Sequence, residues 1–146
     1  MIKDLFKVEI GKNVDGNKVD KLSGKFAYIT RKETDNGLDG FIDHDKKFLN
    51  SKFPVITIGN ETAKPYVQVF PFFTGTKVNI LSPKKFLSRL TLQFIAQSIQ
   101  THKKSFSYSF TINSTRLKNL SIMLPVTESG APDFEYMERY MRRQEN

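Results

Sequence analysis

The feature that most constrains the fold of this chain is a series of short segments with β-strand character. They alternate apolar and polar residues or are rich in β-branched and aromatic side chains, and they lie at residues 26–30, 53–58, 66–70, 76–81, 106–112 and 120–124. Such patterns are typical of half-buried strands. Because 146 residues make one ordinary domain that can bury a core, we expect a single β-rich domain.

Two segments have helical rather than β-type spacing. Ser82 and Pro83 offer a cap and a first-turn proline, and apolar residues then recur at helical spacing at Leu87, Leu90, Phe94, Ile95 and Ile99. A second helix is expected from Pro132, with acidic residues in its first turn. Its apolar stripe is Phe134, Met137, Tyr140 and Met141. Together with the strands, these helices predict an α+β fold.

The charge balance indicates a polyanionic partner. The chain has 23 Lys and Arg against 15 Asp and Glu, which gives a formal net charge of +8. It has no cysteine, so disulfides and cysteine-bound zinc are excluded. No apolar run approaches the length of a membrane span, and the first residues lack a signal-peptide core, so we expect a cytoplasmic protein.

Catalytic motifs are scarce in this sequence. Gly16 and Gly24 have the wrong spacing for a phosphate-binding loop. Asp43, His44 and Asp45 form an acidic–histidine triplet, but such a triplet in a turn is usually solvated, and we expect no metal there. A non-enzymatic role is therefore favoured, with a metal-dependent nuclease and a module for single-stranded RNA or DNA as the alternatives.

The order of several motifs resembles one family along nearly the whole chain. The stretches are "DLFKVEIGK" (4–12), "SGKFAYITR" (23–31), "NGLDGFID" (36–43), "ITIGNETAKPYVQVFPFFTGTKVNILSPK" (56–84), "FSYSFTINSTRLKNLSIMLPV" (106–126) and "GAPDFEYMERYM" (130–141). Their order and spacing are similar to the target-recognition half of the DNA specificity subunit of type I restriction–modification systems and of related type IIB enzymes. The first of these stretches looks like an initial strand, and the last looks like the start of a helix.

The resemblance implies an α+β target-recognition domain over residues 1–129. Residues 130–146 would begin a helix that acts as a spacer and dimerisation element. Such a domain reads one half of a split sequence in double-stranded DNA and carries no chemistry or cofactor itself. Its partners would be the methyltransferase (modification) subunit and the restriction subunit. Specificity subunits usually have two recognition halves, so this chain is either a half-subunit that pairs with itself or a fragment.

The loop at residues 30–37 has side chains suited to reading base edges. Arg31 and Lys32 can donate to guanine, and Asn36 can bond adenine with both ends of its amide, while Thr30 lies at the start of the loop. Asn36 with Gly37 also suits a tight hairpin turn, and both interpretations stay open for Asn36.

Other candidate contacts to DNA lie on three further segments. Ser107 and Ser109 alternate with aromatic residues, so their hydroxyls are expected on the outer face of a strand, although an ordinary surface strand has the same pattern. Arg116 and Lys118 are expected to extend that face. A second edge comprises Asn60, Lys64 and Gln68, and Lys103 and Lys104 are expected to contact phosphates.

The helix at the end of the chain is expected to meet a partner helix. Phe134, Met137, Tyr140 and Met141 give it an apolar stripe, and a helix this short is marginal in water unless it docks against its own domain or a second chain.

Overall fold

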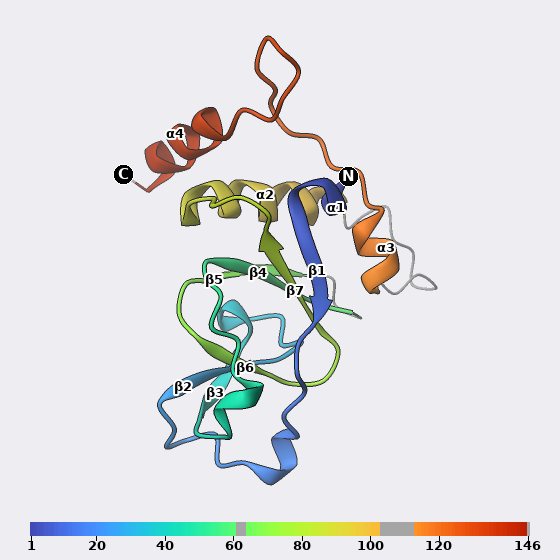
Figure 1. Cartoon of the computed structure of the whole chain (residues 1–146). Coiled ribbons are helices and arrows are strands. Elements are labelled where there is room, and N and C mark those ends of the chain that lie inside the picture. Colours follow the sequence, from blue (N-terminus) through green and yellow to red (C-terminus); the bar gives the residue numbers. More distant parts are fainter. Residues whose placement is uncertain (61–63, 103–112, 146) are drawn as a thin grey trace.

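The chain folds into two β-sheets and a layer of helices (Figure 1). The computed structural model describes residues 1–60, 64–102 and 113–145. This architecture confirms the predicted α+β class. The expected strand at 106–112 lies outside the described residues.

The larger sheet is antiparallel throughout and has the strand order β1-β7-β4-β5. Its strands are β1 (Phe6–Ile10), β7 (Val78–Pro83), β4 (Val55–Gly59) and β5 (Pro65–Gln68). The pairing of β1 with β7 sets Lys7 opposite Ser82 and Val8 opposite Leu81. The first and seventh strands of the chain are therefore neighbours, and β1 forms one edge of the sheet.

The smaller sheet has the order β3-β2-β6, with β2 (Phe26–Ile29), β3 (Leu38–Ile42) and β6 (Phe72–Thr74). Strands β2 and β3 form an antiparallel hairpin, and β6 runs parallel to β2. Two short strands, β3 and β6, were not predicted from the sequence, because residues 31–40 are dominated by turn-forming types and β6 has only three residues. Short 3₁₀ turns lie at Gly16–Lys18 (η1), Asp35–Gly37 (η2) and Lys46–Phe48 (η3).

The larger sheet is the middle layer of the molecule. One of its faces packs against helix α2 (Arg89–His102) through a core that includes Val8, Ile56, Leu81 and Ile95. Its other face meets the smaller sheet through Ile29, Val55, Phe72 and Ile80. Helix α4 (Phe134–Gln144) lies against α2 on the side away from the sheet (Figure 1). Helices α1 (Ile2–Leu5) and α3 (Ser114–Lys118) pack together beside β1.

Helix α2 begins later than the sequence predicts. Strand β7 continues to Pro83, and Lys84 N still donates to Leu5 O at 2.9 Å, so Ser82 and Pro83 belong to the sheet. The hydroxyl oxygen of Ser88 instead accepts from Thr91 N at 3.2 Å. The predicted start at Ser82 was wrong because both serines have the chemistry of a cap, and only pairing with β1 distinguishes them.

The predicted strand at residues 120–124 is also wrong. Residues 120–124 pair with no strand in the described part of the chain, and their alternating pattern has a different cause. Leu120, Ile122 and Leu124 pack against the main core as partly buried side chains, whereas Met123 is 83% exposed. An extended segment lying on a core shows the same period of two as a strand.

Helix α4 buries its apolar stripe within this chain. Met137 is fully buried and Met141 is 6% exposed, and Phe94 of α2 contacts the ring of Tyr140 edge-on at 5.6 Å. The prediction that Met137 and Met141 contact a partner helix is corrected, because α2 already covers them. Phe134 is partly buried on the same core, so of the four predicted contacts only Tyr140, 38% exposed, presents substantial surface. No helix within the described part of the chain is long and apolar enough to cross a membrane.

Candidate nucleic-acid interface

The loop at residues 30–37 connects β2 to β3 and is closed by its own backbone. Thr30 N donates to Gly37 O at 3.0 Å, and Lys32 N donates to the hydroxyl oxygen of Thr30 at 3.2 Å. Asp35, Asn36 and Gly37 adopt left-handed φ values of 55°, 59° and 78°. Asn, Asp and Gly tolerate this region best, so the local sequence suits the turn. We call residues 30–37 the recognition loop.

The recognition loop is braced from one side by β5 and the residue before it. Asn36 Nδ2 donates to Val67 O at 2.9 Å, and Gln68 Nε2 donates back to Asn36 O at 2.9 Å. Lys64 Nζ donates to Glu33 O at 2.9 Å, and the hydroxyl of Tyr66 donates to the same carbonyl. The loop is therefore held to the larger sheet along its length.

These contacts define what three predicted DNA-binding residues do inside the protein. Gln68 is only 7% exposed, and Nε2 also donates to the hydroxyl oxygen of Thr57 at 3.1 Å, so both of its amide hydrogens are used. The amide of Asn36 is committed to Val67 O, and the ammonium of Lys64 lies 5.7 Å from the centre of the Tyr66 ring. For Asn36, the geometry favours the turn-forming interpretation.

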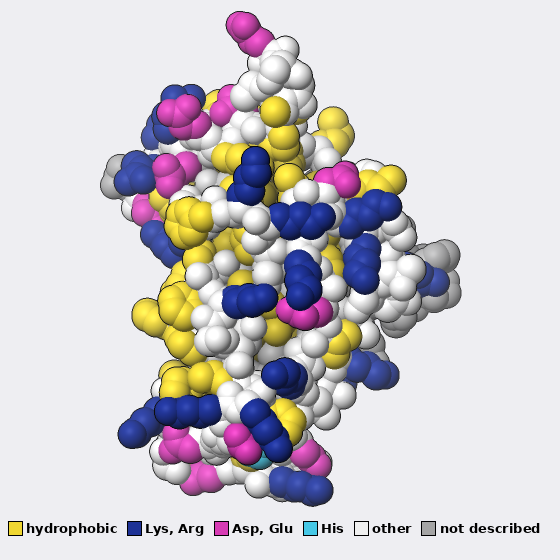
Figure 2. Space-filling model, in the orientation of Figure 1, with side chains coloured by type: hydrophobic (Ala, Val, Ile, Leu, Met, Phe, Trp, Pro, Cys, Tyr) yellow, Lys and Arg dark blue, Asp and Glu magenta, His cyan; other side chains and the backbone are white. Residues whose placement is uncertain are grey.

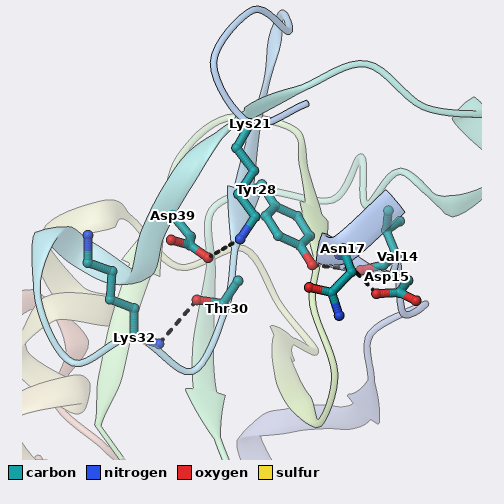
Figure 3. A network of polar contacts seen from close by, with 8 residues as sticks. All are labelled: Val14, Asp15, Asn17, Lys21, Tyr28, Thr30, Lys32 and Asp39. Carbon is teal, nitrogen blue, oxygen red and sulfur yellow. Dashed lines mark hydrogen bonds and ion pairs between the residues drawn. The ribbon is translucent and has the colours of Figure 1, made fainter. Parts of the chain in front are cut away.

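The other side of the recognition loop forms one wall of an open cleft of about 360 Å³. Thr30, Arg31 and Lys32 line it from the loop, and residues 13–17, Lys21, Tyr28, Gly75 and Thr76 complete it. Figure 3 shows this arrangement, with Lys32 and Thr30 on one side and Asn17 and Asp15 on the other. The cleft brings the predicted Thr30, Arg31 and Lys32 together with polar residues that sequence reasoning did not connect to them.

A polar network fixes the floor of this cleft (Figure 3). The hydroxyl of Tyr28 donates to Val14 O at 2.6 Å, and Lys21 Nζ lies 3.3 Å from Asp39 Oδ2. Burial raises the pKa of the Tyr28 phenol, and the charges of Asp39 and Asp15 raise it further, so this phenol stays a neutral donor.

Two glycines let the backbone come close to this floor. A Cβ at Gly16 would lie 3.0 Å from the hydroxyl of Tyr28, and one at Gly75 would lie 3.1 Å from Thr30 Cγ2. Gly16 between Asp15 and Asn17, and Gly75 between two threonines, were the available signal, but the sequence does not reveal which loop a glycine faces.

Lys32 and Asp35 form an exposed ion pair within the recognition loop, with Nζ 2.9 Å from Oδ2. The hydrogen bond to Asp35 raises the pKa of Lys32, and the same contact lowers the pKa of Asp35. The stability that the Asp35 carboxylate contributes to the folded state is present above its ordinary pKa and is lost as pH falls through the lowered pKa. The stability that the Lys32 ammonium contributes is lost only as pH rises through the raised pKa of Lys32. The pair is therefore charged on both sides at neutral pH, and solvent weakens it.

The remaining predicted residues lie elsewhere. Asn60 Oδ1 accepts from Asn79 Nδ2, and Asn79 Oδ1 accepts from the hydroxyl of Ser114 at 2.7 Å, so Asn60 belongs to a polar network that reaches α3. Arg116 and Lys118 lie on helix α3, which corrects their placement on a strand face. Asn113 caps this helix, with Oδ1 accepting from Arg116 N at 2.9 Å. Lys103, Lys104, Ser107 and Ser109 lie outside the described residues.

The acidic–histidine triplet takes part in local packing. Asp43 Oδ1 accepts from Lys25 N, Asp45 Oδ1 accepts from Lys47 N, and His44 contacts the rings of Phe48 and Phe73. Within residues 1–60, 64–102 and 113–145, no group of three or more His, Cys, Asp or Glu side chains is placed to hold a metal ion.

Comparisons with known proteins point in one direction. Residues 1–146 match the family described as the type I restriction modification DNA specificity domain. The chain is 54% identical over 144 residues to S.BcgI, the specificity subunit of a type II restriction enzyme from Heyndrickxia coagulans, covering 98% of this chain and 42% of that protein. The chain thus spans less than half the length of this relative.

Solved structures share the fold at low sequence identity. The S subunit of a type I restriction–modification system from M. genitalium is 19% identical with a TM-score of 0.64, covering 83% of this chain and 32% of that one. The HsdS subunit from Thermoanaerobacter tengcongensis is 13% identical with a TM-score of 0.66, covering 99% of this chain and 35% of that one. At these identities the likeness establishes the fold.

Proposed function

Because this chain belongs to the family of type I restriction–modification DNA specificity domains, we propose that it binds duplex DNA as the target-recognition half of a specificity subunit. In this role it reads one half of a bipartite target and docks a methyltransferase subunit. The chemistry then belongs to the partner subunits, and this chain supplies sequence selection.

The observation that carries the proposal is the construction of the recognition loop. Four side-chain hydrogen bonds between the loop and residues 64–68 hold it against the larger sheet, while Thr30, Arg31 and Lys32 line the open cleft on the other side. A reading loop has to present donors in a fixed geometry, because discrimination between bases depends on the positions of hydrogen-bonding groups.

The geometry divides the predicted residues into two roles. Arg31 and Lys32 contact DNA, Arg31 as the candidate for a two-pronged contact to guanine. Asn36, Lys64 and Gln68 are positioning residues, because their polar groups are used to hold the loop. Arg116 and Lys118 on α3, with Lys103, Lys104, Ser107 and Ser109, are candidates for contacts to the DNA backbone.

The partner subunits follow from the family. A specificity subunit acts together with a methyltransferase subunit, and a second recognition half has to come from another chain or from a longer form of this one. The match to less than half of S.BcgI supports a single half in these residues.

The first test is the salt dependence of DNA binding by the whole chain. Because most of the affinity of one half-site comes from phosphates, affinity for duplex DNA is expected to fall by on the order of 10³ or more between 50 and 200 mM salt. The measurement is fluorescence anisotropy with labelled duplex, with a single strand of the same sequence as competitor. Salt-insensitive binding, preference for the single strand, or magnesium-dependent cleavage of the probe would contradict the proposal.

A second test separates the reading of bases from sequence-independent attraction to DNA. Arg31→Ala is expected to reduce discrimination at one base position by about 1–3 kcal/mol, measured by selection from randomised duplexes and sequencing. Arg139→Ala, which removes an exposed arginine on α4, is the matched control and is expected to leave the selected sequence unchanged. Equal, sequence-independent losses in both variants would show that Arg31 does not read a base.

A further inference from the structure

Away from the recognition loop, five lysines surround a single hollow of about 730 Å³. Its wall also contains Phe6, Val8, Ser82 and Pro83, and the lysines are Lys3, Lys7, Lys52, Lys84 and Lys118. They come from α1, β1, the segment before β4, the residue after β7 and α3, so only the folded chain brings them together. Figure 2 shows Lys and Arg side chains gathered over the part of the molecule where β1 and β7 lie in Figure 1.

The lysine hollow has little negative charge of its own. Lys7 Nζ lies 3.9 Å from Glu9 Oε2, a long pair between exposed groups. Asp4, the other nearby carboxylate, accepts from the Met1 amine at 3.0 Å. Among the described residues, Lys3, Lys52, Lys84 and Lys118 have no carboxylate within ion-pair distance. Five ammonium groups around one hollow repel each other, and an anion bound there removes that repulsion.

A buried hydroxyl in the wall of this hollow points to the same class of ligand. Ser82 is 7% exposed, and its Oγ is buried without a hydrogen-bond partner in the described structure. Buried hydroxyls almost always have a partner, so this one calls for an explanation. Ser82 lies opposite Lys7 in the pairing of β1 with β7, so the two side chains leave neighbouring strands on the same face of the sheet.

We infer that the lysine hollow binds phosphate oxygens of the DNA backbone, with Ser82 donating a hydrogen bond. This inference rests on the proposed function and adds a contact surface separate from the recognition loop. Lysine supplies a compact charge without the two-pronged geometry of arginine, which suits attraction to phosphates over base reading, and the hollow is lined by lysines and no arginine.

The surface continues beyond this hollow. A second depression of about 280 Å³ shares Lys7 and Lys52 with it and adds Lys12, with Glu9 as the one acidic residue in its lining. Ammonium groups spread along the β1 edge can therefore contact several successive phosphates of a DNA strand. Binding a single small anion would not require a surface of this length.

The decisive variant is Lys7→Gln with Lys84→Gln, compared with Arg139→Gln with Arg143→Gln on the exposed side of α4. Both pairs remove two positive charges, so the net charge changes equally. The hollow variant is expected to bind every duplex roughly 10–100-fold more weakly at 0.1 M salt and to reduce the slope of log affinity against log salt by about 2. The control is expected to keep both values.

Ser82→Ala tests the hydroxyl separately. Removing an unpartnered buried hydroxyl is expected to leave thermal stability unchanged or raised, because no internal hydrogen bond is lost. DNA affinity is nevertheless expected to fall several-fold, with the same base preference. Ser98→Ala on α2 is the control for a serine hydroxyl that has an internal partner, Phe94 O at 3.3 Å. Unchanged DNA affinity of Ser82→Ala would remove Ser82 from the inference.

The outcomes separate this inference from the proposed function. If the chain binds no duplex DNA, the proposed function fails. If it binds with a steep salt slope and the hollow and control pairs behave alike, the hollow is not a phosphate site and the inference alone fails. If the hollow variant keeps DNA affinity and instead loses binding to a methyltransferase subunit, the lysines meet acidic groups of a protein, which also overturns the inference.

Discussion

Several side chains in this protein serve to fix the position of the recognition loop. Asn36 and Gln68 exchange hydrogen bonds between the recognition loop and β5, so that one amide orients the loop and the other is buried behind it. These contacts hold the loop that contains Arg31 and Lys32, and Lys32 adds an ion pair with Asp35 and a backbone hydrogen bond to Thr30. We therefore propose that Arg31 and Lys32 contact DNA, whereas Asn36 and Gln68 hold the loop in position.

At this scale we predict that Gln68→Ala destabilises the protein by about 1–3 kcal/mol, because Asn36 O and the hydroxyl of Thr57 lose their buried donor. Urea denaturation followed by circular dichroism measures this difference. Gln97→Ala, at an exposed position of α2, is the control and is expected to change stability little. A Gln68 variant as stable as the control would show that the amide network does not hold the loop.

Among the secondary-structure elements, α4 differs most from the role that its sequence predicts. Its sequence contains an apolar stripe that suits pairing with another chain, but Met137 and Met141 are buried in this domain with α2 against them. Tyr136 and Tyr140, each 38% exposed and stacked with ring centres 6.3 Å apart, are the aromatic surface that α4 keeps. Any helix that pairs with α4 therefore meets its outer face.

We predict that Met137→Ala lowers the free energy of unfolding by about 2–5 kcal/mol, because it removes a fully buried side chain from the main core. Met123→Ala is the matched control, since this methionine is 83% exposed, and is expected to change stability by less than about 0.5 kcal/mol. Thermal denaturation of both variants compares them directly. Equal effects would mean that α4 does not pack against α2 in solution.

At the scale of the whole molecule, two candidate surfaces lie near opposite edges of the larger sheet, one at β5 and the other at β1. The recognition loop belongs to the smaller sheet and is braced by the larger one, whereas the lysine hollow lies at the β1–β7 edge beside α1 and α3. We therefore expect substitutions in one of these surfaces to leave the proposed role of the other unchanged.

We predict that the chain by itself sediments as a monomer, because its most apolar helix face is already buried. Analytical ultracentrifugation at several concentrations measures this. Tyr136→Ala with Tyr140→Ala is expected to leave the distribution unchanged. A tight dimer that these changes dissociate would identify the outer face of α4 as a self-pairing surface and contradict the prediction.

The local pattern of side chains was sufficient to predict the class of the fold and where the loop at residues 30–37 lies in the chain. The segments at 26–30, 53–58, 66–70 and 76–81 contain strands, because alternation reports which side chains a pleated strand buries. Arg31, Lys32 and Asn36 mark the loop because charged and turn-forming residues concentrate where the chain leaves a sheet. Order and spacing of the motifs also indicated the family, which comparison with known proteins confirmed.

Tertiary structure alone distinguished residues that look alike in sequence. Ser82 and Ser88 both resemble caps, and only pairing with β1 places Ser82 in a strand beside Lys7. Leu120 and Ile122 alternate like residues of a strand but pair with no strand among residues 1–60, 64–102 and 113–145, and Met137 lies against α2 within the chain. The lysine hollow joins Lys3 to Lys118 across most of the sequence. Each of these outcomes depends on which segments become neighbours, and periodicity contains no information about a partner that is distant along the chain.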